Sequence, residues 1–138
     1  MQKIVSHWSS AIVISAGLSL AVIASVIAQG KPAAESPELA YNDYCRECHA
    51  FDKGDNRLGP TLYGVFGRKA GSLPGYDYSI SLKSSDITWN EKTLDEWIAD
   101  PNSLVPGNNM GSVFSGVPDA ATRAKIIAFL KHDTRTKK

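Results

Sequence analysis

The apolar residues of this chain recur at helical spacing in three short stretches. In the first, residues 37–48, Pro37 stands at the first helical position and Ser36 before it is a capping residue. In the last, residues 118–133, the apolar face is formed by Ile126, Ile127, Phe129 and Leu130. We therefore expect a helix near each end of the folded part of the chain.

A further helix is predicted for residues 90–101. Its apolar positions, which recur at i, i+3 and i+4, are Leu94, Trp97 and Ile98. Thr93 is a suitable cap for this helix. Pro101 is expected to end it, because proline lacks the N–H that a helix needs.

The segments between these stretches have no regular pattern. Residues 50–78 are dense in Gly and Pro and show no strand alternation, with at most one helical turn near residues 62–66. Residues 105–117 form a second irregular segment. Two long loops are unusual in so small a domain unless something fills the space between them. We therefore expect an all-α domain wrapped around a large apolar cofactor.

The start of the chain is an uncharged apolar run, residues 11–28, that follows the basic Lys3. This pattern is typical of an export signal, cleaved near Ala28. The alternative is an uncleaved membrane anchor, because a helix of this length spans about 27 Å against the ~30 Å of a hydrocarbon core. Both interpretations place the folded domain, residues 38–138, outside the cytoplasm, behind a polar linker at residues 29–37.

The composition and charge of the chain argue against several classes of function. Lys3 is the only charged residue before residue 29, so the rest of the chain carries 14 Lys+Arg and 14 Asp+Glu. This balance argues against nucleic-acid binding and against strong electrostatic steering of a partner. A small exported domain usually needs a cross-link, but a disulfide between Cys45 and Cys48 would close too short a loop to help.

The candidate chemistry lies in YCRECHA, residues 44–50, which holds Cys45, Cys48 and His49. A thiol redox pair normally accompanies a βαβ pattern, which is absent here. A zinc site needs four ligands, and His132 is the one other histidine after the cluster. Both alternatives stay open, but the redox pair leaves His49 without a role, and the zinc site would need His132 from near the end of the chain. Covalent haem uses all three, with two thioethers to the vinyl groups and an imidazole on the iron. We therefore predict one haem c.

The second axial ligand is predicted to be Met110. It is the only methionine after the export signal, and it lies in the polar loop PGNNM, where core filling is the weaker account. His132 is the alternative ligand. A thioether opposite an imidazole favours reduced iron and raises the potential. With both axial positions taken by protein, we expect electron transfer rather than oxygen or peroxide chemistry.

These segments together resemble class I cytochrome c, of the mitochondrial and bacterial c2 type. CRECH, GPTLYGVFGRKAGSLPGYDY, ITWNEKTLDEWIADP and PGNNM occur in the family's order and near its spacing, from Glu38 to about Asp133. The resemblance implies a small all-α fold of few helices and long loops around one haem. It also implies that Tyr41 packs against the last helix, through Phe129 and Leu130.

The resemblance implies roles for further residues around the haem. Pro60 would accept the imidazole N–H of His49 through its carbonyl, and Arg68 would lie beside a haem propionate. Buried carboxylates need such partners. The aromatic residues that would enclose and hydrogen-bond the propionates are Tyr76, Tyr78 and Trp89.

The chain departs from the family's pattern in several places. Trp97 stands where the family usually has a tyrosine hydrogen-bonded to the methionine sulfur, and an indole N–H can donate but not accept. Leu82 replaces a frequent buried asparagine. Lysines that ring the haem edge in mitochondrial forms are replaced by Tyr44, Asn102 and Asn109. Docking to a strongly acidic partner surface is therefore less supported here.

The function implied is that of a monomeric periplasmic one-electron carrier. It would shuttle electrons between a quinol-oxidising complex and a terminal oxidase or other acceptor. One alternative is a membrane-anchored electron wire, in which residues 11–28 stay in the bilayer. A haem peroxidase is the other, which six-coordinate iron and the absence of a visible distal acid–base pair oppose.

Overall fold

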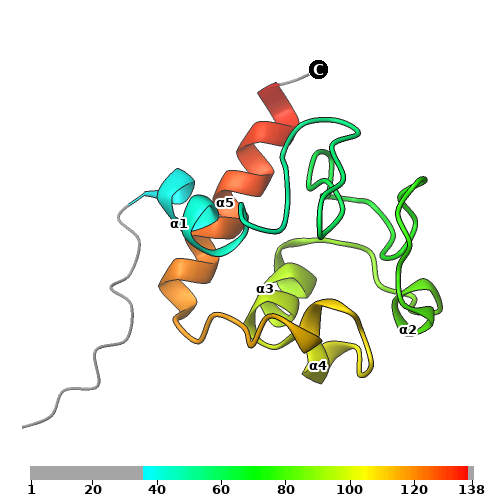
Figure 1. Cartoon of the computed structure of the whole chain (residues 1–138). Helices are drawn as coiled ribbons and strands as arrows, with labels where there is room; N and C mark the ends of the chain where they lie inside the picture. The colour runs from blue at the N-terminus through cyan, green and yellow to red at the C-terminus, as the bar shows by residue number, and fades with distance from the viewer. Residues whose placement is uncertain (1–35, 137–138) are drawn as a thin grey trace, which may run out of the picture. The chain divides into compact units, whose positions relative to one another are not determined.

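The computed structural model describes residues 36–136, with side chains described as far as His132. The predicted export signal, residues 1–28, lies outside the described residues. The described elements, in chain order, are α1 (Pro37–Tyr44), α2 (Ile80–Lys83), α3 (Glu91–Ala99), α4 (Pro101–Leu104), a 3-10 helix η1 (Met110–Ser112) and α5 (Ala120–Thr136) (Figure 1). Strand pairing in residues 36–136 is limited to one isolated bridge between Lys69 and Thr88. No helix of this described part is both long and apolar enough to cross a membrane.

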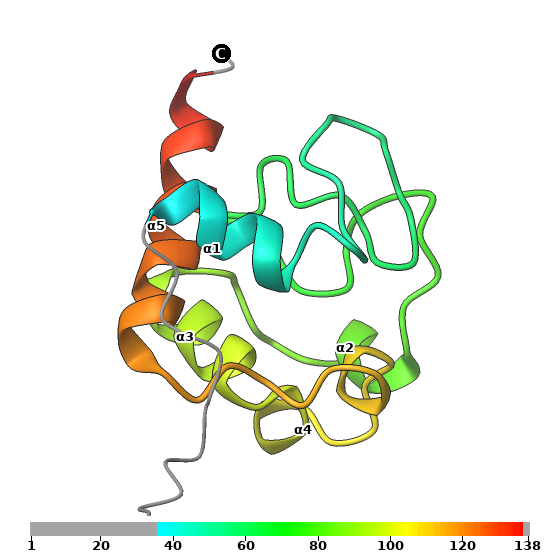
Figure 2. The ribbon, with the colours of Figure 1, turned by 60° about the vertical axis from the view of Figure 1, so that its left-hand side comes forward.

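The first and last helices cross each other and form one side of the domain (Figure 2). Tyr41 of α1 stacks on Phe129 of α5, with ring centroids 4.5 Å apart. Phe51, just beyond α1, meets the same ring edge-on at 5.4 Å. Aromatic pairs of this kind add to the stabilisation that burial alone provides. The predicted packing of Tyr41 on the last helix is confirmed.

The start of α3 differs from the sequence-based prediction. Asn90 is its N-cap, and its Oδ1 accepts the N–H of Thr93 at 3.0 Å. Thr93 lies one turn inside, and its hydroxyl oxygen accepts the N–H of Asn90 at 2.9 Å. The prediction of Thr93 as the cap was therefore wrong, because the two residues form a reciprocal capping box in which both are polar. The helix ends before Pro101, as predicted, and Pro101 begins α4.

Arg123 fixes α5 against α3. Its Nε donates to Asp95 Oδ1 of α3 at 2.7 Å. One terminal nitrogen also donates to the carbonyls of Val117 and Pro118, at 3.0 and 2.9 Å. Because these carbonyls precede α5, a single guanidinium sets the position at which α5 begins relative to α3.

The long loop, residues 50–78, consists of turns, and the single helical turn predicted near residues 62–66 is absent. Hydrogen bonds within the loop replace regular structure. The Tyr76 hydroxyl donates to the Leu58 carbonyl at 2.6 Å, which ties the two ends of the loop together. The loop is also joined to the segment before α3, since Trp89 N donates to the Arg68 carbonyl at 3.0 Å. These links give an irregular segment a defined shape.

Candidate haem site

A cavity of about 380 Å³ lies between the long loop on one side and α3 and the η1 region on the other. Its walls are mostly apolar and aromatic. Every residue that the sequence predicted for the site lines it, namely Cys45, Cys48, His49, Pro60, Arg68, Tyr76, Tyr78, Trp89, Trp97 and Met110. The fold therefore brings together residues that are more than sixty positions apart in the chain.

The two cysteines follow directly from the end of α1. Cys45 is its C-cap, with its N–H donating to the Tyr41 carbonyl at 2.8 Å. A turn then brings the His49 N–H to the Cys45 carbonyl at 2.9 Å, so both thiols and the imidazole border the cavity. The thiols form no disulfide. Burial raises the pKa of Cys45 to about 12, which opposes the alternative of a reactive thiol couple, because such couples need a lowered thiol pKa.

The orientation of His49 is set by the carbonyl of Pro60. The distance from His49 Nδ1 to the Pro60 oxygen is 2.7 Å. A carbonyl oxygen can only accept, so Nδ1 carries the hydrogen and Nε2 keeps a lone pair for a metal. Burial lowers the pKa of His49, although the hydrogen bond to Pro60 acts in the opposite direction. The ring is thus neutral and oriented, which are the two properties that an iron ligand requires.

Gly59 is a site residue that the sequence analysis missed. A Cβ atom at this position would lie 2.2 Å from His49 Cε1, far inside van der Waals contact. The Gly59 N–H also donates to the Cys48 carbonyl at 2.7 Å. The glycine therefore lets the loop pass directly against the imidazole. Its only signal in the sequence is the Gly-Pro pair that opens GPTLYG.

Arg68 supports the loop that presents Pro60. Its two terminal nitrogens donate to the carbonyls of Tyr63 and Thr61, at 3.1 and 3.0 Å. Burial lowers the pKa of Arg68 from its ordinary value, but a guanidinium stays charged in proteins. Arg68 therefore places a fixed positive charge at the cavity wall, in addition to shaping the loop.

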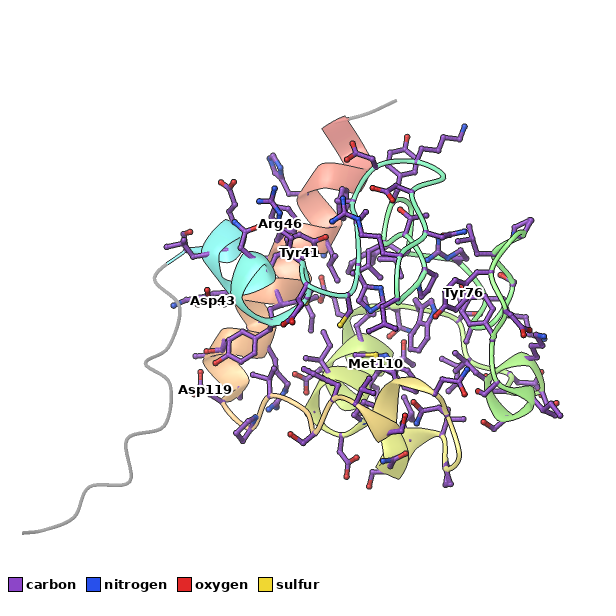
Figure 3. The ribbon with its side chains drawn as sticks, in the orientation of Figure 1. Tyr41, Asp43, Arg46, Tyr76, Met110 and Asp119 are labelled. Atoms are coloured by element: carbon purple, nitrogen blue, oxygen red, sulfur yellow. The ribbon has the colours of Figure 1, made fainter. Side chains whose placement is uncertain are left out.

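The aromatic residues of the site form two contacting pairs. Tyr76 and Tyr78 meet edge-on with centroids 4.8 Å apart, and Trp89 and Trp97 are tilted at 5.4 Å. Burial raises the pKa of Tyr76 and of Tyr78, so both phenols remain neutral. The Tyr76 hydroxyl donates to the Leu58 carbonyl, and Figure 3 labels Tyr76 among the loops in the right-hand half of the domain. The propionate roles of these residues remain predictions.

Met110 reaches the cavity from η1, near the middle of the domain in Figure 3. Its side chain is half-buried. Trp97 also lines the cavity, and among the described side chains no hydrogen bond joins its Nε1 to the Met110 sulfur. His132, the alternative ligand, is exposed near the end of α5 and does not line the cavity.

The donor set and the walls of the cavity suit a haem. An imidazole nitrogen and a thioether border it, two thiols lie at its edge, and aromatic and aliphatic side chains cover the rest. Arg68 is the one Lys or Arg side chain among the described lining residues, and no Asp or Glu lines the cavity. The described residues contain no group of three or more His, Cys, Asp or Glu side chains arranged to hold a metal ion alone. The zinc alternative would need His132, which is exposed and does not line the cavity.

Comparison with known proteins gives a consistent result. No protein-family model matches the chain. Cytochrome c2 iso-2 of Magnetospirillum fulvum is 46% identical over 87 residues, which are 63% of this chain and 88% of that protein. Cytochrome c2 iso-1 of Magnetospirillum molischianum is 41% identical over 98 residues, 71% of this chain and 97% of that protein. The structure of cytochrome cH from Methylobacterium extorquens aligns with a TM-score of 0.65 at 44% identity, and covers 72% of this chain and 97% of that one.

Proposed function

This chain belongs to the class I cytochrome c family, and we propose that it carries single electrons in the periplasm, from a quinol-oxidising complex to a terminal oxidase or other acceptor. As a member of this family it is an electron-transfer protein rather than an enzyme, with one haem c attached through Cys45 and Cys48. The observation that carries the proposal is the pairing of an oriented, neutral His49 with Met110 at one apolar cavity.

His49 and Met110 are the proposed axial ligands. When bound, the haem supplies a one-electron Fe(III)/Fe(II) couple, so one electron enters and one leaves in each cycle. Pro60 holds the His49 ring through Nδ1, so that Nε2 would be free to bind the iron. The mostly apolar walls would limit the access of water to the haem, which suits electron transfer.

The cavity lining supports a carrier over a peroxidase. Apart from His49, the described lining residues include no histidine, aspartate or glutamate that could act as a distal acid or base. Arg68 is held by two backbone carbonyls beside the Pro60 loop. Peroxide cleavage needs a positioned proton acceptor, which this lining does not provide.

The axial assignment is tested by the visible spectrum of the ferric protein. We expect a weak thioether–iron band in the wild type and its complete loss in Met110→Ala, because alanine offers no donor to iron. His132→Ala is the matched control and should keep the band, since His132 is exposed and outside the cavity. A band that persists in Met110→Ala would overturn the assignment.

Export and anchoring form a separate part of the proposal. The apolar run of residues 11–28 supports export to the periplasm. We propose cleavage near Ala28 and a freely diffusing monomer, with the membrane-anchored wire as the alternative. N-terminal sequencing of protein from periplasmic and membrane fractions separates the two. A soluble form that starts at Gln29 supports cleavage, whereas a membrane form that starts at Met1 supports the anchor.

A further inference from the structure

Three residues beside Met110 form a closed ring of hydrogen bonds through two side-chain amides and the two peptide groups of a glycine. Gly111 N donates to Asn108 Oδ1 at 2.7 Å. Asn108 Nδ2 donates to Asn102 Oδ1 at 3.2 Å. Asn102 Nδ2 completes the circle by donating to the Gly111 carbonyl at 2.9 Å. We call Asn102, Asn108 and Gly111 the amide ring. Each of its members is both donor and acceptor, so the bonds support one another.

The amide ring is fixed to the helical part of the domain. Asn102 belongs to α4, and its backbone N–H donates to Asp100 Oδ1 at 3.0 Å. Asn108 is buried, with 5% of its surface exposed, and also donates to the Val105 carbonyl at 2.8 Å. Because α4 follows α3 directly, the ring links Gly111, the residue after Met110, to these two helices.

Gly111 leaves the space that the ring needs. A Cβ atom at this position would lie 2.3 Å from Asn102 Oδ1 and 2.6 Å from Asn102 Nδ2. Any larger residue would therefore push the Asn102 amide away from the Gly111 peptide. The absence of a side chain at Gly111 thus leaves room for the carboxamide of Asn102.

The Met110 side chain receives no comparable support at its sulfur. Among the hydrogen bonds of the described residues, none is donated to this sulfur by Trp97 or by any other side chain. The backbone is held instead, since the Met110 carbonyl accepts the N–H of Phe114 at 2.9 Å and of Val113 at 3.1 Å. The conformation of the chain on both sides of Met110 thus decides where the sulfur lies.

We propose that Asn102 is a positioning residue for Met110, and that the amide ring holds the thioether in place against exchange with a ligand from solution. This rests on the proposed axial role of Met110. Imidazole binds the iron only in molecules whose thioether has left, so its apparent affinity rises in proportion to that open fraction. Loosening the ring should therefore tighten imidazole binding without any new contact.

The test is an imidazole titration of the ferric holoprotein, followed by loss of the thioether–iron band. Asn102→Leu keeps the size of the side chain but removes both hydrogen bonds, and should raise the apparent imidazole affinity about tenfold. Ser103→Leu places a leucine at the exposed neighbour of Asn102 in α4, which is outside the amide ring and does not line the cavity, and should change the affinity by less than about twofold.

A second set of variants separates positioning from general loss of stability. Gly111→Ala should raise the affinity about as much as Asn102→Leu, since the new Cβ displaces the Asn102 amide. In an Asn102→Ala background the amide is already gone, so adding Gly111→Ala should change the affinity by less than about twofold. Urea unfolding, followed by tryptophan fluorescence, checks that every variant is folded under the conditions of the titration.

The outcomes distinguish this inference from the proposed function. Wild-type imidazole affinity in both Asn102→Leu and Gly111→Ala would overturn the role of the ring, as would fully additive effects in the double variant. If instead Met110→Ala keeps the thioether–iron band, the axial assignment itself fails. If Asn102→Leu does not fold, Gly111→Ala alone decides, with a rise supporting the ring and no rise contradicting it.

Discussion

His49 and Met110 border the same cavity, and the protein holds these two side chains by different means. The imidazole is held directly. The Pro60 carbonyl accepts a hydrogen bond from its Nδ1, and Gly59 lies against its ring. The thioether has no such contact, and the amide ring fixes the backbone beside it instead. We call Gly59, Pro60 and His49 the His49 wall, and we call Met110 together with the amide ring the Met110 wall.

The difference follows from the chemistry of the two side chains. An imidazole has a second nitrogen, so the protein can orient it through an N–H while the first nitrogen faces the metal. A thioether has only one weak acceptor atom, and that atom is the one required by the iron. A protein that leaves the sulfur free must therefore position it through the main chain. Changes in the His49 wall should therefore displace the His49 imidazole itself, whereas changes in the Met110 wall should displace the loop that carries Met110.

The largest effect is expected from Gly59→Ala. The added Cβ would lie 2.2 Å from His49 Cε1, so either the ring or the loop must move. We expect a loss of about 3 kcal/mol in the free energy of unfolding, measured by urea denaturation. Gly64→Ala is the control, because a Cβ there meets open space and costs only the ~1–2 kcal/mol of a left-handed residue. If both variants lose the same free energy of unfolding, the direct contact between Gly59 and the imidazole is contradicted.

A smaller effect is expected from Arg68→Lys. Lysine keeps the charge but cannot donate to two carbonyls at once, so the bonds to Thr61 and Tyr63 cannot both form. We expect a loss of about 2 kcal/mol in the free energy of unfolding. Backbone hydrogen exchange should become faster in the loop around Pro60 and stay unchanged around Met110. Faster exchange in both places would mean that the two walls are not independent.

Tyr41→Phe should have a milder effect on the same wall. The Tyr41 hydroxyl donates to the His49 carbonyl at 3.0 Å, whereas the stacking on Phe129 needs only the ring. Phenylalanine should therefore cost about 1 kcal/mol, seen as a lower urea midpoint with an unchanged slope. Tyr41→Leu, which also removes the stacking, should cost more, by about 1 kcal/mol. If Phe and Leu cost the same, the hydroxyl rather than the ring is the main contribution of Tyr41.

The smallest effect lies outside both walls, at the start of α5. Asp119 Oδ2 accepts the N–H of Thr122 at 2.7 Å, and hydrogen bonds with Thr122 hold the pKa of Asp119 below its ordinary value of 3.8. The unfolded chain binds a proton more readily, so this contribution is complete above pH 3.8 and is lost as the pH falls through the lower folded value. In Asp119→Asn, the free energy of unfolding should therefore fall less steeply as the pH is lowered. An unchanged pH profile would show that the carboxylate does not contribute.

Much of the fold was predictable because its signals are local. Ser36 and Pro37 begin α1, and the i, i+3, i+4 pattern around Trp97 marks α3. The cap of α3 was mistaken because Asn90 and Thr93 are both capping residues, and only the reciprocal bonds show which comes first. The shape of residues 50–78 could not be predicted, since distant hydrogen bonds determine it rather than any periodicity.

The candidate site likewise contains residues that the sequence predicted and residues that it did not. Cys45, Cys48 and His49 were predicted from their spacing together with the export signal and the lack of other ligands, and Met110 from being the only methionine after that signal, in a polar loop. Gly59 and the amide ring were missed. Asn102 and Asn109 looked alike in the sequence, as positions that lack a lysine, but only Asn102 enters the ring.

The sequence by itself indicated the chemistry of this protein. Two thiols and an imidazole within five residues, together with the export signal, the few other candidate ligands and the two long loops, predict a covalently attached haem, because these signals depend on residue type and spacing. The tertiary structure alone decided how the two ligand side chains are held. A Cβ at Gly59 or Gly111 is harmless in an extended chain and is excluded only because the chain folds back and brings His49 or Asn102 within 2.2 or 2.3 Å. Such distances result from the packing of the whole domain, and no local pattern encodes them.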